Sequence, residues 1–126
     1  MTEFTVHMAN RPGQLAALAD RLSDAGIHIE ALAAFSQGTD SMVRLMANDV
    51  DTTRRVLTDA GVRFEEQRVI ETVIKDAPDA LATMTRRLAD SGVNIEAMYL
   101  LHANGDSLHF AVAVDDHETA AHLSNL

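Results

Sequence analysis

Hydrophobic and polar residues follow two different periods along the chain. Residues Glu3–Met8 alternate at every second position, which is typical of a strand with one buried face. Leu15, Leu18 and Leu22 then recur at helical spacing as far as Gly26, a residue type that suits the left-handed conformation just past a helix end. The pattern therefore predicts a strand followed by an amphipathic helix.

The next segments extend this order. The pattern predicts two strands around a tight turn at Gly38, a helix that ends at Gly61, and a long β-prone stretch. The long stretch is expected to hold the last strand of one unit and the first strand of the next. These segments are Ile27–Ser36, Ser41–Ala47, Val50–Ala60 and Val62–Ile74.

The first part of the chain is written twice. Residues 10–32 return sixty-six positions later, so that Pro12 corresponds to Pro78 and Gly26 to Gly92, and the same spacing extends to Leu57 and Leu123. The second copy repeats a helix before Gly92. It then predicts strands over 93–103 and 107–114 around an Asn104-Gly105 turn, and a final helix over 115–126.

The duplication predicts an α+β chain of two ferredoxin-like βαββαβ repeats side by side, with antiparallel sheets and helices on one face of each. We place the first repeat at residues 1–67 and the second at 68–126. The second copy ends before any fourth strand. Either that strand is absent, or something from the first copy or from a second chain covers the exposed edge.

Residue alternation also assigns the sheet faces. With Asn104-Gly105 as the loop, Tyr99 lies opposite Phe110 on the helix-covered face, and the same face holds Arg44 in the first copy. The opposite, outer face remains mostly apolar and predicts packing against another sheet in a homodimer. It comprises Met98, Leu100, His102, His109, Ala111 and Ala113 in the second copy and Leu32, Ala34, Val43, Leu45 and Ala47 in the first.

Composition narrows the classes of function. The formal net charge of −9 disfavours binding to a nucleic-acid backbone or to an anionic membrane surface. There is no apolar run of membrane-spanning length, no charged-then-apolar leader and no cysteine, so we expect a cytoplasmic protein without disulfide or thiolate chemistry. No cofactor is expected.

Two segments resemble the ACT domain. Asn10-Arg11-Pro12-Gly13-Gln14-Leu15 opens the first helix, and Gly92-Val93-Asn94-Ile95 enters a strand, and both match the best-defined parts of that family. With two copies covering nearly the whole chain, the sequence resembles a stand-alone tandem ACT protein. The resemblance implies a regulatory module that binds a small ligand, most often an amino acid, at the boundary between two such domains.

The resemblance implies ligand contacts from Asn10, Arg11, Pro12, Gly13, Gln14 and Leu15 on one side and from Val93, Asn94 and Ile95 on the other. The chemistry agrees, because a helix N-terminus offers unpaired N–H donors to a carboxylate and a glycine permits close approach. In the second copy Asp76 and Asp79 replace Asn10 and Gly13, and two carboxylates would repel an incoming carboxylate. We therefore expect the loop from Asp76 to Leu81 to bind weakly or not at all.

Alternative interpretations remain. The chain could be a protein–protein interaction module or an enzyme's regulatory subunit without a working ligand site. Six histidines raise the question of a metal site, but His117 and His122 do not share a helix face well and no carboxylate accompanies His102 and His109. We therefore expect no metal site and interpret His102 and His109 as interface histidines, whose protonation would make association sensitive to pH. Glu30 and Glu96 occupy matching positions and are better explained as duplicated strand residues than as a catalytic pair. We expect a protein that is not an enzyme.

Overall fold

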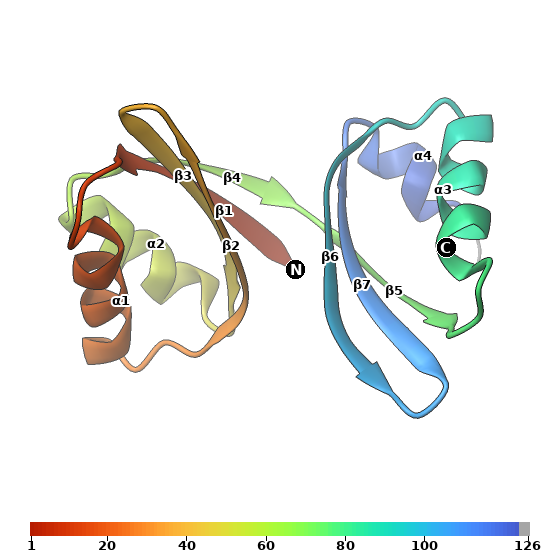
Figure 1. The fold of residues 1–126 in the computed structure, drawn as a ribbon, viewed down its shortest axis with the longest axis horizontal. Coiled ribbons are helices and arrows are strands. Elements are labelled where there is room, and N and C mark those ends of the chain that lie inside the picture. Colours follow the sequence, from red (N-terminus) through yellow and green to blue (C-terminus); the bar gives the residue numbers. More distant parts are fainter. Residues whose placement is uncertain (124–126) are drawn as a thin grey trace. The chain divides into compact units, whose positions relative to one another are not determined.

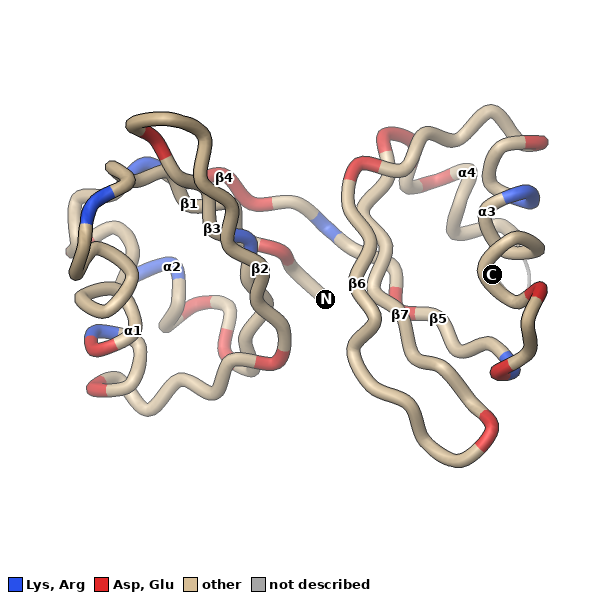
Figure 2. The backbone as a smooth tube through the Cα atoms, in the orientation of Figure 1, with Lys and Arg blue, Asp and Glu red and all other residues tan. Residues whose placement is uncertain are grey.

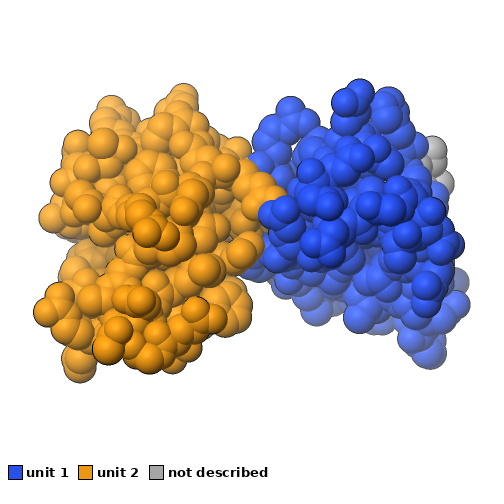
Figure 3. Space-filling model, turned by 90° about the horizontal axis from the view of Figure 1, so that it is seen from above, with its two compact units in different colours: residues 1, 68–126 blue, residues 2–67 orange. Residues whose placement is uncertain are grey.

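The computed structural model of the chain describes residues 1–123 and divides into two compact units. One unit comprises residues 2–67, and the other comprises residues 68–126 together with Met1 (Figure 3). Each holds one copy of the repeated sequence and is described by itself. No helix among the described residues has the length and apolar character that a membrane span requires.

The first unit is a four-stranded sheet of order β2-β3-β1-β4 with both helices on one face (Figure 1). Strands β1 and β2 each pair antiparallel with β3. The elements are β1 (Thr2–Ala9), α1 (Gln14–Asp24), β2 (Ile29–Gln37), β3 (Asp40–Ala47), α2 (Val50–Asp59) and β4 (Arg63–Arg68).

The second unit repeats this order as far as its second helix. Its described residues form a three-stranded antiparallel sheet of order β5-β7-β6 with helices on one face. The elements are β5 (Ile70–Lys75), α3 (Ala80–Asp90), β6 (Ile95–Asn104), β7 (Ser107–Val114) and α4 (His117–Ala121). The α+β architecture of two ferredoxin-like repeats is confirmed. Residues 124–126 of the helix predicted over 115–126 lie outside the described residues.

The core of each unit lies between the helices and alternate residues of the middle strand. In the first unit Val43 and Leu45 of β3 are buried with Leu22 of α1, and in the second Phe110 and Val112 of β7 are buried in the same way. Burial of one such aliphatic side chain contributes about 1.5–3 kcal/mol. Strands β6 and β7 carry a single charged residue, Glu96, between them, and they are almost wholly uncharged in Figure 2.

The prediction of which β3 residues face the helices is wrong. Val43, Leu45 and Ala47 belong to the buried core and not to the outer face. Arg44 instead lies on the outer face, where its Nη1 is 3.3 Å from Oε1 of Glu3. Leu32 pairs with Leu45 and Ala34 with Val43, so they too share the helix-covered face.

One extra residue in β6 explains the error. The pairing of β6 with β7 shifts by one residue between Leu100 and His102, so that Leu101 forms a bulge that β2 lacks at the corresponding place. The repeat offset is 66 for β1 and β5 (4 to 70) but 67 for their partners on β3 and β7 (45 to 112). A uniform offset of sixty-six therefore exchanged the two faces of β3.

Because of the same bulge, the faces predicted for Met98, Tyr99 and Leu100 of β6 are also wrong. Leu100 lies opposite Phe110 and Met98 opposite Val112, so both face the helices and not the outer side. Tyr99, predicted on the helix-covered face, lies opposite Ala111 on the outer face. The assignments for β7 itself, with Phe110, Val112 and Val114 inward, are confirmed.

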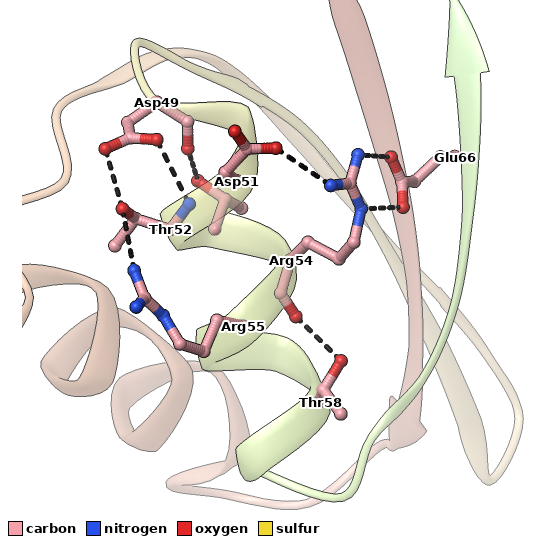
Figure 4. A network of polar contacts seen from close by, with 8 residues as sticks. Asp49, Asp51, Thr52, Arg54, Arg55, Thr58 and Glu66 are labelled. Carbon is pink, nitrogen blue, oxygen red and sulfur yellow. Dashed lines mark hydrogen bonds and ion pairs between the residues drawn. The ribbon is translucent and has the colours of Figure 1, made fainter.

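Both second helices begin with the same aspartate cap. Asp49 accepts hydrogen bonds from the backbone N–H of Thr52 at 3.0 Å and from its hydroxyl at 2.7 Å, and Asp116 accepts the same pair from Thr119 (Figure 4 shows the first). The threonine hydroxyl, and then the backbone N–H, holds the pKa of each aspartate below its ordinary value.

An ion pair fastens α2 to β4. The Arg54 guanidinium donates to both carboxylate oxygens of Glu66, at 2.6 and 2.7 Å, and also to Asp51 at 3.0 Å (Figure 4). The Arg54 hydrogen bonds lower the pKa of Glu66 and raise that of Arg54 itself. Such a bidentate pair fixes orientation as well as distance, so it holds the edge strand against the helix.

Acid should unfold the chain partly through its caps. Because the folded pKa values of Asp49 and Asp116 lie below their ordinary values, the stability they contribute is present above about pH 4 and is lost as the pH falls through the folded values. The double variant Asp49→Asn, Asp116→Asn keeps an acceptor oxygen but no charge. It should melt below the wild type near neutral pH and together with it in strong acid. Melting curves by circular dichroism across this range check the expectation, and a melting difference that does not vary with pH would contradict it.

Candidate functional site

A small cavity lies beside the loop between β1 and α1 of the first unit. Its volume is about 230 Å³, below the roughly 300–1,000 Å³ of pockets that take drug-sized ligands. The residues that line it come from the end of β1, the loop, the start of α1 and the β2–β3 hairpin. They are Met8, Ala9, Asn10, Arg11, Gln14, Leu15, Ala34, Phe35, Ser36, Ser41 and Val43.

Asn10 ties the loop to the tip of the hairpin. Its backbone N–H donates to the carbonyl of Thr39 at 2.8 Å, and its Nδ2 donates to the carbonyl of Gly38 at 3.0 Å. These bonds are possible because β1 pairs directly with β3, which brings the end of β1 beside the turn that precedes β3. With Nδ2 engaged, Oδ1 of Asn10 is the atom that can accept from a ligand.

The loop closes through a left-handed glycine. Gly13 has φ of 89° and precedes the first residue of α1, and no side chain caps that helix end. Pro12 lies in the turn before Gly13 and outside the helix. The N–H of Gln14 donates to the carbonyl of Arg11 at 3.3 Å. The N–H groups of the next two residues, Leu15 and Ala16, have no acceptor within the helix, so they can donate to a group outside it.

The lining suits a small molecule with charge at one end and an apolar group at the other. Arg11 supplies a cation, and the start of α1 adds the partial positive charge of the helix dipole. Asn10 and Gln14 offer amides, while Leu15 and Ala34 offer apolar surface. An α-carboxylate next to Arg11 and the helix, with its ammonium at Oδ1 of Asn10, would use these groups together.

The predicted site residues separate into three groups. Asn10, Arg11, Gln14 and Leu15 line the cavity, whereas Pro12 and Gly13 shape the turn without lining it. Val93 is buried in the core of the second unit, and Ile95 packs against that core. Asn94 is exposed, and its N–H donates to Asp115 at 2.9 Å. Closure of the first loop by Val93, Asn94 and Ile95 stays a prediction.

The sequence analysis missed the hairpin side of the cavity. Ala34, Phe35 and Ser36 of β2 and Ser41 of β3 form that wall, and the Ser41 hydroxyl donates to the carbonyl of Met8 at 3.2 Å. The signal was present, because in a βαββ arrangement the second and third strands form a hairpin beside the first. That neighbourhood places the hairpin tip next to the Asn10 loop.

The corresponding loop of the second unit has another shape. Asp79 adopts φ of −99°, an ordinary right-handed value, where Gly13 is left-handed. The nearby cavity, of about 280 Å³, is lined by residues of β5, the loop and α3, among them Lys75, Asp79, Thr83 and Arg87, and by none from the β6–β7 hairpin. The amino acid change from glycine to aspartate thus accompanies a change in backbone conformation.

Two other features were compared with this cavity. A larger and more polar hollow of about 360 Å³ adjoins it and shares Met8 and Ser41, but it is lined by no helix N-terminus. His102 and His109 stack across the β6–β7 pair with ring centres 4.1 Å apart. Among the described residues, no group of three or more histidine, aspartate or glutamate side chains is arranged to hold a metal ion.

Comparison with known proteins identifies the fold. No family model and no curated protein matches the sequence. The solved structure of protein BT0572 from Bacteroides thetaiotaomicron is 22% identical, with a TM-score of 0.86 over 95% of this chain and 83% of that one. The aspartate kinase regulatory subunit from Thermus thermophilus, in a ligand-free form, is 16% identical, with a TM-score of 0.68 over 90% and 81%.

The corresponding subunit from Thermus flavus is 18% identical, with a TM-score of 0.61 over 94% of this chain and 86% of that one. At these identities the likeness concerns the fold alone. The chain has the tandem ACT-type fold, and the resemblance inferred from its two motifs is confirmed at that level.

Removal of the Asn10 side chain should lower the stability of the protein, because this side chain holds the loop beside the cavity. Asn10→Ala eliminates the bond to the carbonyl of Gly38 and should cost about 0.5–1.5 kcal/mol in the free energy of unfolding. Asp76→Ala at the corresponding position in the second loop is the matched control and should cost less. Urea denaturation of both variants measures the difference, and equal losses would show that the Asn10 tie contributes nothing.

Proposed function

We propose that this chain is a non-catalytic regulatory protein that binds an amino acid in the cavity beside the first loop. The observation that carries the proposal is the convergence of Arg11, Asn10 and the uncapped start of α1 on one small cavity. Solved structures with this fold include regulatory subunits of aspartate kinase, which supports a regulatory role.

The ligand carboxylate lies at the N–H groups of Leu15 and Ala16 and near the Arg11 guanidinium in this proposal. The ammonium is bound by Oδ1 of Asn10, and the side chain of the ligand points toward Leu15 and Ala34. Each contact is one for which the donor or acceptor is available in the first unit. Following the sequence motif, Asn94 of a second repeat adds a further polar contact to the same ligand.

Regulation requires that the ligand prefer one arrangement of the protein over another. We propose that the protein acts in the cytoplasm as a homodimer, and that ligand binding changes how it engages a metabolic enzyme. The outer face of the first sheet is a candidate for the enzyme contact, because it presents Phe35, 52% exposed, without a helix over it in its own unit.

A thermal-shift screen against the twenty amino acids tests the proposal. At about 100 times its Kd, a ligand that binds only the folded state stabilises it by about 2.7 kcal/mol, which should raise the melting temperature by several degrees. Gly13→Asp should abolish this rise, because a carboxylate next to the start of α1 would repel the ligand carboxylate and compete for the N–H groups of Leu15 and Ala16. Absence of a rise with every amino acid at millimolar concentration would overturn the proposal.

Gly26→Asp is the matched control for that variant. Gly13 and Gly26 both have positive φ, of 89° and 73°, and a side chain at either position would meet no atom within 4 Å. Each substitution should therefore carry the same backbone cost of about 1 kcal/mol. Both variants should melt earlier than the wild type, but only Gly13→Asp should lose the ligand response.

A second candidate function is a protein–protein interaction module without a working ligand site. The exposed Phe35 on the outer face favours it. In that case Phe35→Glu would abolish binding to the partner enzyme while no amino acid changes the melting temperature. The two candidates thus give opposite results in the same thermal screen.

A further inference from the structure

A second hollow lies on the outer face of the first sheet, beside the β2–β3 hairpin. Its volume is about 360 Å³, within the roughly 300–1,000 Å³ of pockets that take small ligands. All four strands of the sheet line it, and every lining residue belongs to the first unit. They are His7 and Met8 of β1, Gln37 of β2, Asp40, Ser41 and Met42 of β3, and Arg63 of β4.

Strand alternation places the polar lining residues of β1, β2 and β3 on the outer face. Val43 of β3 is buried under the helices, so Met42 and Asp40 lie on the opposite side of that strand. Met42 lies directly opposite His7 of β1. Asp40 lies directly opposite Gln37 of β2. Directly opposite residues share a face, so these four side chains surround the hollow from the outer side.

Strand β4 contributes a cation to the same side. Phe64 packs against the core, so Arg63 and Glu65 on either side of it face outward. Oε2 of Glu65 lies 2.6 Å from Nε2 of His7, and an ionised carboxylate can only accept a hydrogen bond. Glu65 is therefore engaged by His7, and Arg63 is left to interact with a molecule from outside.

Three side chains at the rim of the hollow have no partner in the part of the chain that the structure describes. Arg63, Asp40 and Gln37 are exposed, and none of their side chains forms a hydrogen bond or an ion pair within residues 1–123. His7 and Met42 are half-buried and form the floor. The hollow thus has a charged rim around a floor that is partly apolar.

The two opposite charges of the rim lie on strands that are not neighbours. Asp40 belongs to β3 and Arg63 to β4, and β1 lies between these strands. Two strand spacings amount to about 10 Å. Side chains on one face stand roughly perpendicular to the sheet, so the carboxylate and the guanidinium remain apart. A ligand can therefore place one of its own charges at each.

We propose that this hollow binds a small zwitterion whose two charged groups are separated by a short spacer, as in a dipeptide or an ω-amino acid. The ligand carboxylate accepts hydrogen bonds from the guanidinium of Arg63. Its ammonium donates to the carboxylate of Asp40 and to the amide oxygen of Gln37. The spacer crosses β1 over His7 and packs on Met42.

The distance between the strands excludes an α-amino acid from making both contacts. With a charge-assisted hydrogen bond of about 2.8 Å at each end, the charged groups of the ligand lie roughly 4–5 Å apart. An α-amino acid carries both groups on one carbon, which holds them closer together. The cavity beside the first loop differs in this respect, because Asn10 and Arg11 are consecutive residues. The two hollows therefore select different separations of charge.

This inference goes beyond the proposed function and shares none of its polar ligand contacts, so the two can fail separately. Gly13→Asp should abolish the response to α-amino acids and leave the binding of glycylglycine intact, whereas Arg63→Gln should do the reverse. Glycine should not bind to Gly13→Asp, because both of its charges lie on one carbon. Equal affinity of glycine and glycylglycine for Gly13→Asp would refute the selection by charge separation.

Isothermal titration calorimetry with glycylglycine and 4-aminobutanoate tests the site. Both probes separate their charges and differ in the spacer, so binding of either supports the site and a preference identifies the spacer. Arg63→Gln and Asp40→Asn should each raise the Kd of the bound probe at least tenfold. The controls, Arg86→Gln on α3 and Asp106→Asn in the turn of the second hairpin, should leave it unchanged. Binding of neither probe at millimolar concentration, or a Kd that Arg63→Gln or Asp40→Asn leaves unchanged, would overturn the inference.

Exchange of the two charges gives an independent measurement. Arg63→Asp alone leaves carboxylates on both sides of the hollow and should abolish binding of the probe. The double variant Asp40→Arg, Arg63→Asp restores one charge of each sign. Because the amide of Gln37 can donate as well as accept, the probe should then bind in the opposite direction. A double variant that binds no more tightly than Arg63→Asp would contradict the assignment of these two residues.

Discussion

The face on which each paired strand residue lies depends on one inner strand in each sheet, β3 in the first and β7 in the second. Strands β3 and β7 each have a neighbour on both sides, and they send every second residue under the helices. Because the side-chain period of a strand is two, the burial of Val43 and Leu45 fixes which residues of β1 and β2 share their face. The strand residues between them then form the outer face.

The candidate ligand site follows from the same pairing. Antiparallel β1 and β3 bring the end of β1 to the tip of the hairpin, where Asn10 bonds to two consecutive carbonyls. That contact holds the loop, and the loop in turn directs the start of α1 toward the cavity. A binding site for a small zwitterion therefore needs no unusual chemistry in this fold, only a short turn that leaves the helix end uncapped.

Much of this could be predicted from residue patterns, and the exceptions have one physical cause. Helix ends at Gly26, Gly61 and Gly92 were evident because each glycine adopts positive φ there. The face of β6 could not be predicted, because Leu101 is apolar and fits either a regular strand or a bulge. Only pairing with β7 reveals it as an extra residue. The hairpin wall of the cavity was missed for a related reason, since Phe35 and Ser36 carry no motif and enter the site through tertiary pairing.

The two first-helix loops have diverged in backbone as well as in sequence. A right-handed conformation at Asp79 is open to any amino acid, whereas the left-handed one at Gly13 excludes most of them at a cost of about 1 kcal/mol or more. The backbone therefore restricts the choice of amino acid at position 13 more than at position 79. Position 79 can change with little effect on the backbone of its turn, while position 13 cannot leave glycine without a conformational cost.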